Sequence, residues 1–476
     1  MKPLLPLLLT TFFCTSVLAQ NITGDWYAIL DAMGTELPLN VQISDQNGQL
    51  SGTLQSPKQS EARLPLSSIS FNGQRLEFAN EQLGLSYSGV LDGKELRGVF
   101  NQAQVDFKLN FYRYRPDGYP IDEGPITIRK REQDPTDFPY EREQVTFPGG
   151  ADGVTLAGEL TMPSKGKPKA AIVLVSGSGP QDRNSYLGSQ INHSPFLVLS
   201  DYLTRQGYAV LRYDDRGVGE STGDYATATT LDFGADAGAA VKWLRAKKDL
   251  KRVPVGIAGH SEGGLIAPYV NAEVEELDFA ILLAAPAVPM DSLMLEQRRL
   301  VYAAQGAPPV VIQRDEPKLR AAYAFIKESE MLDQDQYVEA LYALFEREMG
   351  SLPEALRKSI KDPRAFNQQY VGPLSSPWMR RFIAMDPAPY LEKLTIPVLA
   401  INGLKDLQVP AEMNLNALSI AMARNENKDA TVLPLVGLNH LFQPSETGNV
   451  QEYGTIETTF DPTALEVIGA WLSERY

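Results

Sequence analysis

A serine flanked by glycines, in the stretch GHSEGG of residues 259–264, is placed by its neighbours to act as a nucleophile. Its spacing fits the pattern G-x-S-x-G, which holds a serine on a strained turn between a strand and a helix, the nucleophile elbow. The apolar run VPVGIAG precedes the serine, and GGLIAPYVNA, which can begin a helix, follows it. Glycines are needed on both sides because bulkier residues would collide with that strand and helix. We therefore predict that Ser261 is a nucleophile and not only part of a glycine-rich turn.

A serine hydroxyl needs a general base, and the chain offers three histidines. His440 follows the last predicted strand, in LPLVGLNHLFQP, which is where the base comes in the chain order Ser, acid, His. His260 lies inside the elbow, and we expect its side chain to point away from the hydroxyl and pack beside the strand. His193 precedes the nucleophile in the chain, and we expect it to cap a helix or to lie in a pocket wall. The predicted base is His440.

The acid that orients this base should follow a strand between the serine and the histidine. Asp406, in IPVLAINGLKDLQVP, comes directly after a predicted strand and a short turn. Asp386, in AMDPAPY, is the competing candidate, although its proline-rich surroundings are typical of a segment that leaves an insertion. Asp406 is the predicted acid.

The reaction also needs backbone N–H groups that stabilise an oxyanion. One is predicted at Glu262, directly after the nucleophile, and the other in the loop LVSGSGPQDRN that follows an early strand. Ser178 is the expected donor there, and Gly179 is the alternative. A phosphate-binding loop is the weaker interpretation, because Gly177-x-Gly179 lacks a third glycine.

Short Val-, Ile- and Leu-rich runs alternate with helical patterns from residue 144 onward, as in a parallel sheet covered on both faces. These runs are AAIVLVSG, YAVLRYD, VPVGIAG, FAILLAAP, IPVLAING and ATVLPLVG. They predict a doubly wound α/β sheet built from residues 144–289 and 395–476. Residues 290–394 interrupt it with long polar helices, which predicts a helical lid over the carboxyl ends of the strands.

Three further segments precede the sheet. Residues 20–113 alternate apolar with polar in several short runs, which predicts a small all-β barrel or sandwich with a structural, interaction or carbohydrate-binding role. Residues 114–143 are rich in Pro and charge and predict a linker. Residues 1–19 have a basic start, an apolar run and small residues before Gln20. They predict a signal peptide for periplasmic or secreted export and no stable membrane insertion; a retained anchor is the alternative.

Composition excludes several function classes. The net charge is −15, which disfavours nucleic acid as a partner. The only cysteine, Cys14, lies in the predicted signal peptide, so the exported chain would have no disulfide, thiolate nucleophile or Cys-ligated metal.

Five motifs, SGSGPQDRN, YDDRGVGES, GHSEGG, INGLKDLQVP and GLNHLFQ, together resemble bacterial α/β-hydrolase-fold esterases. These belong to the serine-hydrolase branch that also holds monoglyceride lipases and serine aminopeptidases. The resemblance covers about residues 144–476 and is closest to a thermophilic carboxylesterase group whose loop reads S-G-S-G-P-x-D-R. It implies a doubly wound α/β-hydrolase sheet and hydrolysis of small esters with short acyl chains, without cofactor or metal. Its nucleophile, acid and base fall on Ser261, Asp406 and His440.

Two other functions compete with a serine carboxylesterase. A serine aminopeptidase or amidase of the same fold would need an acidic anchor for a substrate amine, and Glu262 or Asp182 could supply it. A binding module that has lost catalysis is the second, and an intact set of serine, acid and histidine argues against it. The oligomeric state is not indicated by the sequence.

Overall fold

The computed structural model describes residues 22–32, 35–46, 49–57, 63–80, 84–102, 105–116, 131–351 and 354–476. The chain divides into two compact units, Met1–Glu123 and Gly124–Tyr476. The predicted signal peptide lies outside the described residues.

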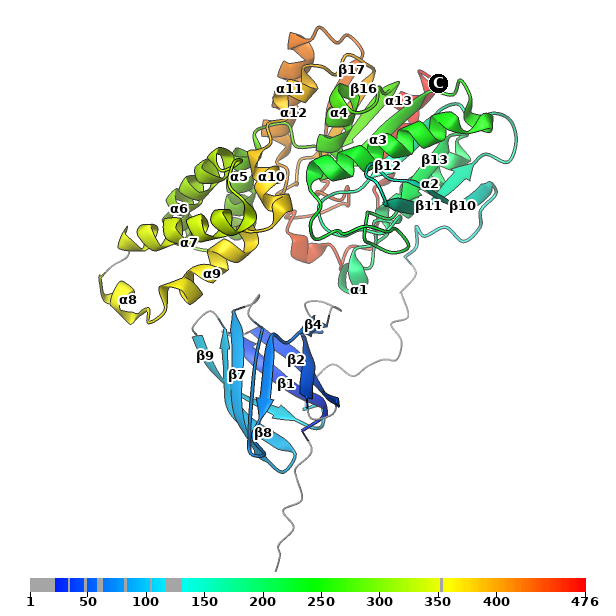
Figure 1. Ribbon diagram of the computed structural model, residues 1–476. Helices are drawn as coiled ribbons and strands as arrows, with labels where there is room; N and C mark the ends of the chain where they lie inside the picture. The colour runs from blue at the N-terminus through cyan, green and yellow to red at the C-terminus, as the bar shows by residue number, and fades with distance from the viewer. Residues whose placement is uncertain are drawn as a thin grey trace, which may run out of the picture. The chain divides into compact units, whose positions relative to one another are not determined.

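The first unit is a curled antiparallel sheet of nine strands in the order β4-β3-β2-β1-β9-β8-β7-β6-β5 (Figure 1). The strands are β1 Gly24–Ala32, β2 Thr35–Gln46, β3 Gln49–Gln55, β4 Leu64–Pro65, β5 Ser68–Phe71, β6 Arg75–Asn80, β7 Leu85–Asp92, β8 Glu95–Gln102 and β9 Val105–Tyr112. Alternate residues face inward, and Tyr87 packs edge-on against Phe111 with ring centroids 5.0 Å apart. The interior of this unit is a core of aliphatic side chains with an aromatic cluster within it.

The second unit contains an eight-stranded sheet in the order β10-β11-β13-β12-β14-β15-β16-β17. Its strands are β10 Glu141–Pro148, β11 Thr155–Met162, β12 Ala171–Val175, β13 Ala209–Tyr213, β14 Val255–His260, β15 Phe279–Leu283, β16 Val398–Gly403 and β17 Ala430–Leu435. The strands from β12 to β17 run parallel, and β11 is antiparallel to both of its neighbours. This is the strand order of an α/β hydrolase, and the six predicted runs are six of these strands.

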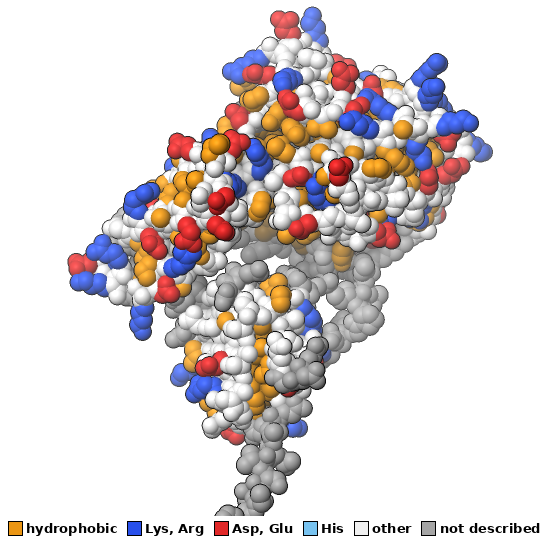
Figure 2. All heavy atoms as spheres, viewed as in Figure 1, with side chains coloured by type: hydrophobic (Ala, Val, Ile, Leu, Met, Phe, Trp, Pro, Cys, Tyr) orange, Lys and Arg blue, Asp and Glu red, His pale blue; other side chains and the backbone are white. Residues whose placement is uncertain are grey.

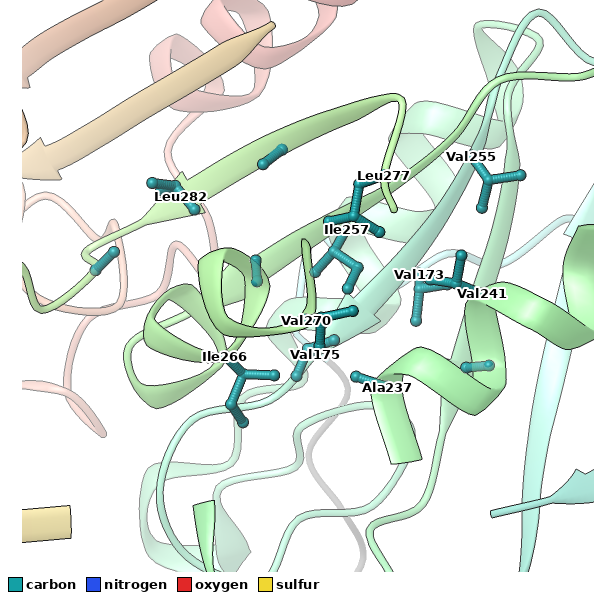
Figure 3. Close-up of a cluster of buried hydrophobic side chains, with 14 of the residues drawn as sticks. Val173, Val175, Ala237, Val241, Val255, Ile257, Ile266, Val270, Leu277 and Leu282 are labelled. Atoms are coloured by element: carbon teal, nitrogen blue, oxygen red, sulfur yellow. The ribbon is translucent and has the colours of Figure 1, made fainter. Parts of the chain in front are cut away.

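Helices cover both faces of this sheet (Figure 1). The bounds are α1 Gly188–Ile191, α2 Pro195–Arg205, α3 Thr230–Ala246, α4 Glu262–Glu273, α12 Ala411–Arg424 and α13 Pro462–Ser473. Figure 3 shows Val173 and Ile257 of the strands meeting Val241 of α3 and Val270 of α4. Alternate strand residues pack on the other face, against α2 and α13, so both faces of the sheet are buried.

A helical insertion separates β15 from β16. It consists of α5 Met290–Ala304, α6 Pro309–Glu328, α7 Gln334–Glu348, α8 Glu354–Ser359, α9 Pro363–Leu374, α10 Pro377–Ala384 and α11 Ala388–Leu391. The apolar side chains of α7 are buried in a core that these helices share, with Tyr337 and Leu341 fully enclosed. The insertion is thus a packed layer with its own apolar centre.

The segment predicted as a linker is partly built into the second unit. Strand β10 already begins at Glu141, and the buried Arg131 donates hydrogen bonds to the carbonyl oxygens of Ile191, Asn192 and Gly454. Apolar periodicity gave no sign of this attachment because it is made through backbone carbonyls.

Charged side chains of both signs are intermixed on the face of the molecule seen in Figure 2. The described part of the chain has no helix of the length and apolarity that a membrane crossing requires.

Candidate active site

Ser261 lies on a strained turn between β14 and α4. Its backbone has φ 54° and ψ −117°, a conformation that costs energy for a residue with a side chain. The Ser261 N–H donates to the carbonyl oxygen of Leu283, at 2.8 Å, which fixes the turn against β15. A Cβ atom at Gly259 would overlap the carbonyl of Gly263, and one at Gly263 would overlap the carbonyl of Val175. The glycines are therefore required by close backbone approach, as the motif predicted.

His440 and Asp406 are joined by a hydrogen bond of 2.7 Å between Nδ1 and Oδ2. Both side chains are buried, which strengthens the interaction by excluding water. The other carboxylate oxygen of Asp406 accepts the N–H groups of Gln408 and Val409, each at 2.8 Å. The carboxylate is thus held rigidly, and it orients the imidazole with its Nε2 atom free for another partner.

The competing candidates lie elsewhere. Asp386 is exposed and accepts the N–H of Ala388 at the start of α11. His193 is buried, and its ring contacts the hydroxyl of Thr459 and the carbonyl oxygen of Tyr453. It neither caps α2, where Ser194 is the N-cap residue, nor lines the pocket described next, but it ties two wall segments together.

Ser261 and His440 line one cavity of about 380 Å³, a size typical of a small-molecule site. No hydrogen bond joins the serine hydroxyl to the imidazole among the described residues. Catalytic hydrogen bonds of this kind commonly tighten only when substrate binds.

The cavity wall is mainly apolar, with Gln181, Gln297 and Gln408 among its polar side chains, and it comes from several parts of the second unit. Helices α5 and α10 of the insertion supply one side, and the loop 449–460 and the region of α1 and α2 supply the others. Its larger side chains are Leu187, Ile191, Phe196, Leu283, Leu293, Met294, Trp378, Phe382, Val409, Leu441, Phe442, Val450, Tyr453 and Phe460. Among the described residues that line it there is no Asp, Glu, Lys or Arg. The pocket therefore suits an uncharged, apolar group.

The contact of His260 with His440 was not anticipated from the sequence. Its ring lines the cavity with its centroid 4.8 Å from that of His440, and its Nε2 atom lies 2.8 Å from the His440 carbonyl oxygen. Because a carbonyl can only accept, Nε2 carries the proton and donates it. Burial and the neighbouring His440 lower the pKa of His260 to about 3, so the ring stays neutral. Its hydrogen bond holds the backbone of His440, the predicted base, in place.

The two predicted oxyanion donors belong to segments that adjoin Ser261. Ser178 lines the cavity, and Glu262 is the first residue of α4. The loop of Ser178 runs so close that a Cβ at Gly177 would lie 3.1 Å from that of Ser261. Within the described residues, neither N–H makes a hydrogen bond to another protein group. Gly179, the alternative, has its backbone bonded to the phenol of Tyr225, which favours Ser178.

The Glu262 side chain has a different environment from the one considered for an amine anchor. It is 2% exposed and accepts hydrogen bonds from Ser178, Thr230 and Trp378. Burial raises the pKa of its carboxyl group. Neither Glu262 nor Asp182 lines the cavity, so neither can meet a substrate ammonium there.

A second buried acid shapes the oxyanion loop and was not anticipated from the sequence. Asp215 accepts the hydroxyl of Ser176 at 2.9 Å and the N–H of Gln181 at 3.0 Å. Burial raises its pKa to about 7. The motif YDDRGVGES contains Asp215, but nothing in its local pattern says that its partners lie more than thirty positions earlier.

Comparison with known proteins adds a family to this geometry. Esterase EstD of Thermotoga maritima is 26% identical over 333 residues, which cover 70% of this chain and 68% of the relative. Solved structures with 18% and 17% identity are the Pyrococcus furiosus esterase Pf2001 and the proline iminopeptidase of Mycobacterium smegmatis. Each match covers 70% of this chain, and 91% and 98% of those chains respectively, with a TM-score of 0.41 in both cases.

The sequence profile of the family described as X-Pro dipeptidyl-peptidase (S15 family) matches residues 152–428. That range includes the elbow, the helical insertion and Asp406, and it is more than half of the chain. The protein therefore belongs to the X-Pro dipeptidyl-peptidase (S15) family.

Proposed function

We propose that this protein is a serine carboxylesterase that hydrolyses esters of short, uncharged acyl groups. The observation that carries the proposal is the strained Ser261 in one apolar pocket with His440, whose Nδ1 atom is bonded to Asp406. The similarity to a protein named as an esterase supports the same chemistry.

In the proposed reaction, Nε2 of His440 removes the proton of the Ser261 hydroxyl as Oγ attacks the ester carbonyl carbon. The carbonyl electron pair moves to oxygen, and the N–H groups of Ser178 and Glu262 stabilise that oxyanion. The tetrahedral intermediate collapses, and the alcohol leaves with the proton from His440. In the second half of the reaction, His440 removes a proton from water as the water oxygen attacks the carbonyl carbon of the acyl-enzyme. The bond to Ser261 Oγ then breaks, His440 returns the proton to Oγ, and the carboxylic acid leaves.

The alternative is a peptidase, which the family description favours. A dipeptidyl- or aminopeptidase binds the free ammonium group of its substrate, and burying that charge without a carboxylate partner costs several kcal/mol. The described wall of the cavity offers no such carboxylate, and Glu262 is engaged with three donors of the protein. These two facts support the esterase.

Parallel assays distinguish the two functions. We expect turnover of p-nitrophenyl esters from acetate upward, with a maximum at short chains, and kcat/KM for aminoacyl and X-Pro p-nitroanilides at least about 100-fold lower. Ser261→Ala serves as the control and should lose both activities. Faster cleavage of the anilides than of the esters would overturn the esterase assignment.

We also propose that the protein is exported and cleaved before Gln20, on the strength of the pattern in residues 1–19. N-terminal sequencing of protein recovered from producing bacterial cells tests this; a chain that still begins at residue 1 would contradict it.

A further inference from the structure

We propose that Glu262 is a positioning residue that couples helix α10 of the insertion to the loop of the oxyanion donor Ser178. The proposal rests on the proposed function. Oε2 of Glu262 accepts the Ser178 hydroxyl at 2.8 Å. Oε1 accepts the Trp378 indole N–H at 2.8 Å and the Thr230 hydroxyl at 2.6 Å.

The three donors come from three separate elements, so this carboxylate is a junction. Ser178 follows β12, Thr230 begins α3, and Trp378 lies in the first turn of α10. A buried carboxylate is costly unless its oxygens are bonded, and hydrogen bonds to a charged group are stronger than those between neutral groups. Loss of any one donor therefore shifts the position of the carboxylate and of the other donors.

Two of the three residues that donate to Glu262, Trp378 and Ser178, also line the substrate pocket. The Trp378 ring lines the cavity and stacks on Phe382, with centroids 4.9 Å apart and an interplanar angle of 22°. Ser178 lines the same cavity beside the nucleophile. An acyl group that binds in the cavity would contact Trp378. Trp378 and Ser178 both donate to Glu262, and the backbone N–H of Ser178 is the proposed donor to the oxyanion. The fit of the acyl group should consequently affect kcat and not only binding.

Two substitutions separate hydrogen bonding from charge. In Glu262→Gln, the amide oxygen can still accept from Trp378 and Thr230, while the amide N–H donates to the Ser178 hydroxyl, which can accept. Glu262→Leu keeps a similar volume and makes none of these bonds. We expect Glu262→Leu to lower kcat about 100-fold and Glu262→Gln to recover at least about 10-fold of that loss. If the two variants were equally impaired, negative charge and not hydrogen bonding would be the requirement, and the proposal would be wrong.

A double-mutant cycle tests the coupling itself. Ser178→Ala removes a hydroxyl but keeps the backbone N–H, and Trp378→Phe removes the indole N–H but keeps an aromatic wall. Coupled residues give non-additive effects. We expect each variant to lower kcat for p-nitrophenyl butyrate about 5-fold, the double variant to lose no more than about 8-fold, and both effects to vanish in the Glu262→Leu background. Rates are expressed per site titrated by burst amplitude, so that misfolded protein does not count.

Independent effects that multiply to about 25-fold, in either background, would overturn the proposal. Its failure is distinct from that of the proposed function, which is decided by the esters and anilides on the unmodified chain. If anilides were the better substrates, the same cycle would be measured with them. If neither class turned over, it would be measured as the rate of Ser261 phosphonylation by a fluorophosphonate, and absence of labelling would contradict both proposals.

Discussion

At the scale of single residues, hydrogen bonds with Asp406 and His260 determine how the His440 side chain is oriented and which of its ring nitrogens carries the proton. Asp406 bonds to Nδ1 of His440 and leaves Nε2 to face the cavity. His260 donates to the backbone carbonyl of the same histidine from the opposite side. The imidazole is therefore fixed in both orientation and tautomer before substrate arrives.

Replacing the acid by its amide tests this arrangement. In Asp406→Asn, an amide N–H can face Nδ1 and force the proton onto Nε2, which then cannot act as a base. We expect kcat for p-nitrophenyl butyrate to fall about 10³–10⁴-fold with little change in KM. Asp386→Asn is the matched control and should stay within about 2-fold of the unmodified protein. A loss below about 10-fold for Asp406→Asn would reject Asp406 as the orienting acid.

His260 gives the stability of the fold a pH dependence. Its pKa is lowered from 6.5 to about 3 in the folded state, so only the unfolded chain binds a proton there between these values. Stability is therefore lost as the pH falls below 6.5, by about 1 kcal/mol from this group at pH 5.5.

Denaturant unfolding of the unmodified protein and of His260→Gln at pH 7.5 and 5.5 measures this contribution. The fall in unfolding free energy between the two pH values should be smaller by about 1 kcal/mol in the variant. Other groups, such as His193 and Asp215, titrate in both proteins and cancel in the comparison. Equal pH dependence of the two proteins would mean that His260 is not held neutral by the fold.

At the scale of elements, the sequence predicted what is encoded locally. The run before Ser261 and the glycines around it dictate a strand, a tight turn and a helix, and β14 and α4 follow that pattern. His440 and Asp406 were predicted as partners because each follows a strand in a sheet whose chain order is constrained, and the structure joins them by a hydrogen bond. The contact of His260 was missed because its partner lies 180 positions away. The bond between Glu262 and Trp378 was missed for the same reason, since it depends on where the insertion packs.

Helix α5 is expected to set the length of the acyl pocket. Met294 lines the cavity, whereas Met331, in the same insertion, is 93% exposed. Met294→Ala enlarges the cavity and should raise kcat/KM for p-nitrophenyl octanoate relative to the butyrate about 5- to 10-fold, in line with about 0.8 kcal/mol per buried CH₂. Met331→Ala should leave that ratio unchanged. An unchanged ratio in Met294→Ala would show that the insertion does not select the acyl chain.

At the scale of the whole molecule, the described cavity belongs to one of the two units only. Every residue that lines the described cavity lies in the unit Gly124–Tyr476. The curled sheet of the first unit encloses an apolar core of aliphatic and aromatic side chains. The sequence predicted its strands from their alternation but offered no chemistry-bearing cluster, and the buried core of its described residues consists mainly of hydrophobic side chains.

Removal of residues 1–123 tests this division. The second unit contains the pocket, the loop of Ser178 and the predicted catalytic residues Ser261, Asp406 and His440. We therefore expect kcat/KM for p-nitrophenyl butyrate to stay within about 2-fold of that of the full chain. Circular dichroism and the melting temperature check that the shortened protein is folded. A folded but inactive product would mean that the first unit contributes to the site.

The central claim is that the Ser261 oxygen becomes covalently bonded to the substrate carbonyl, and chemical labelling tests it most directly. The protein is titrated with a fluorophosphonate, and peptide mass mapping is set beside residual ester turnover. We predict one adduct per chain, on the peptide that carries Ser261, with turnover lost in proportion and no labelling in Ser261→Ala. An adduct on another residue, or full turnover by a completely labelled protein, would contradict the account.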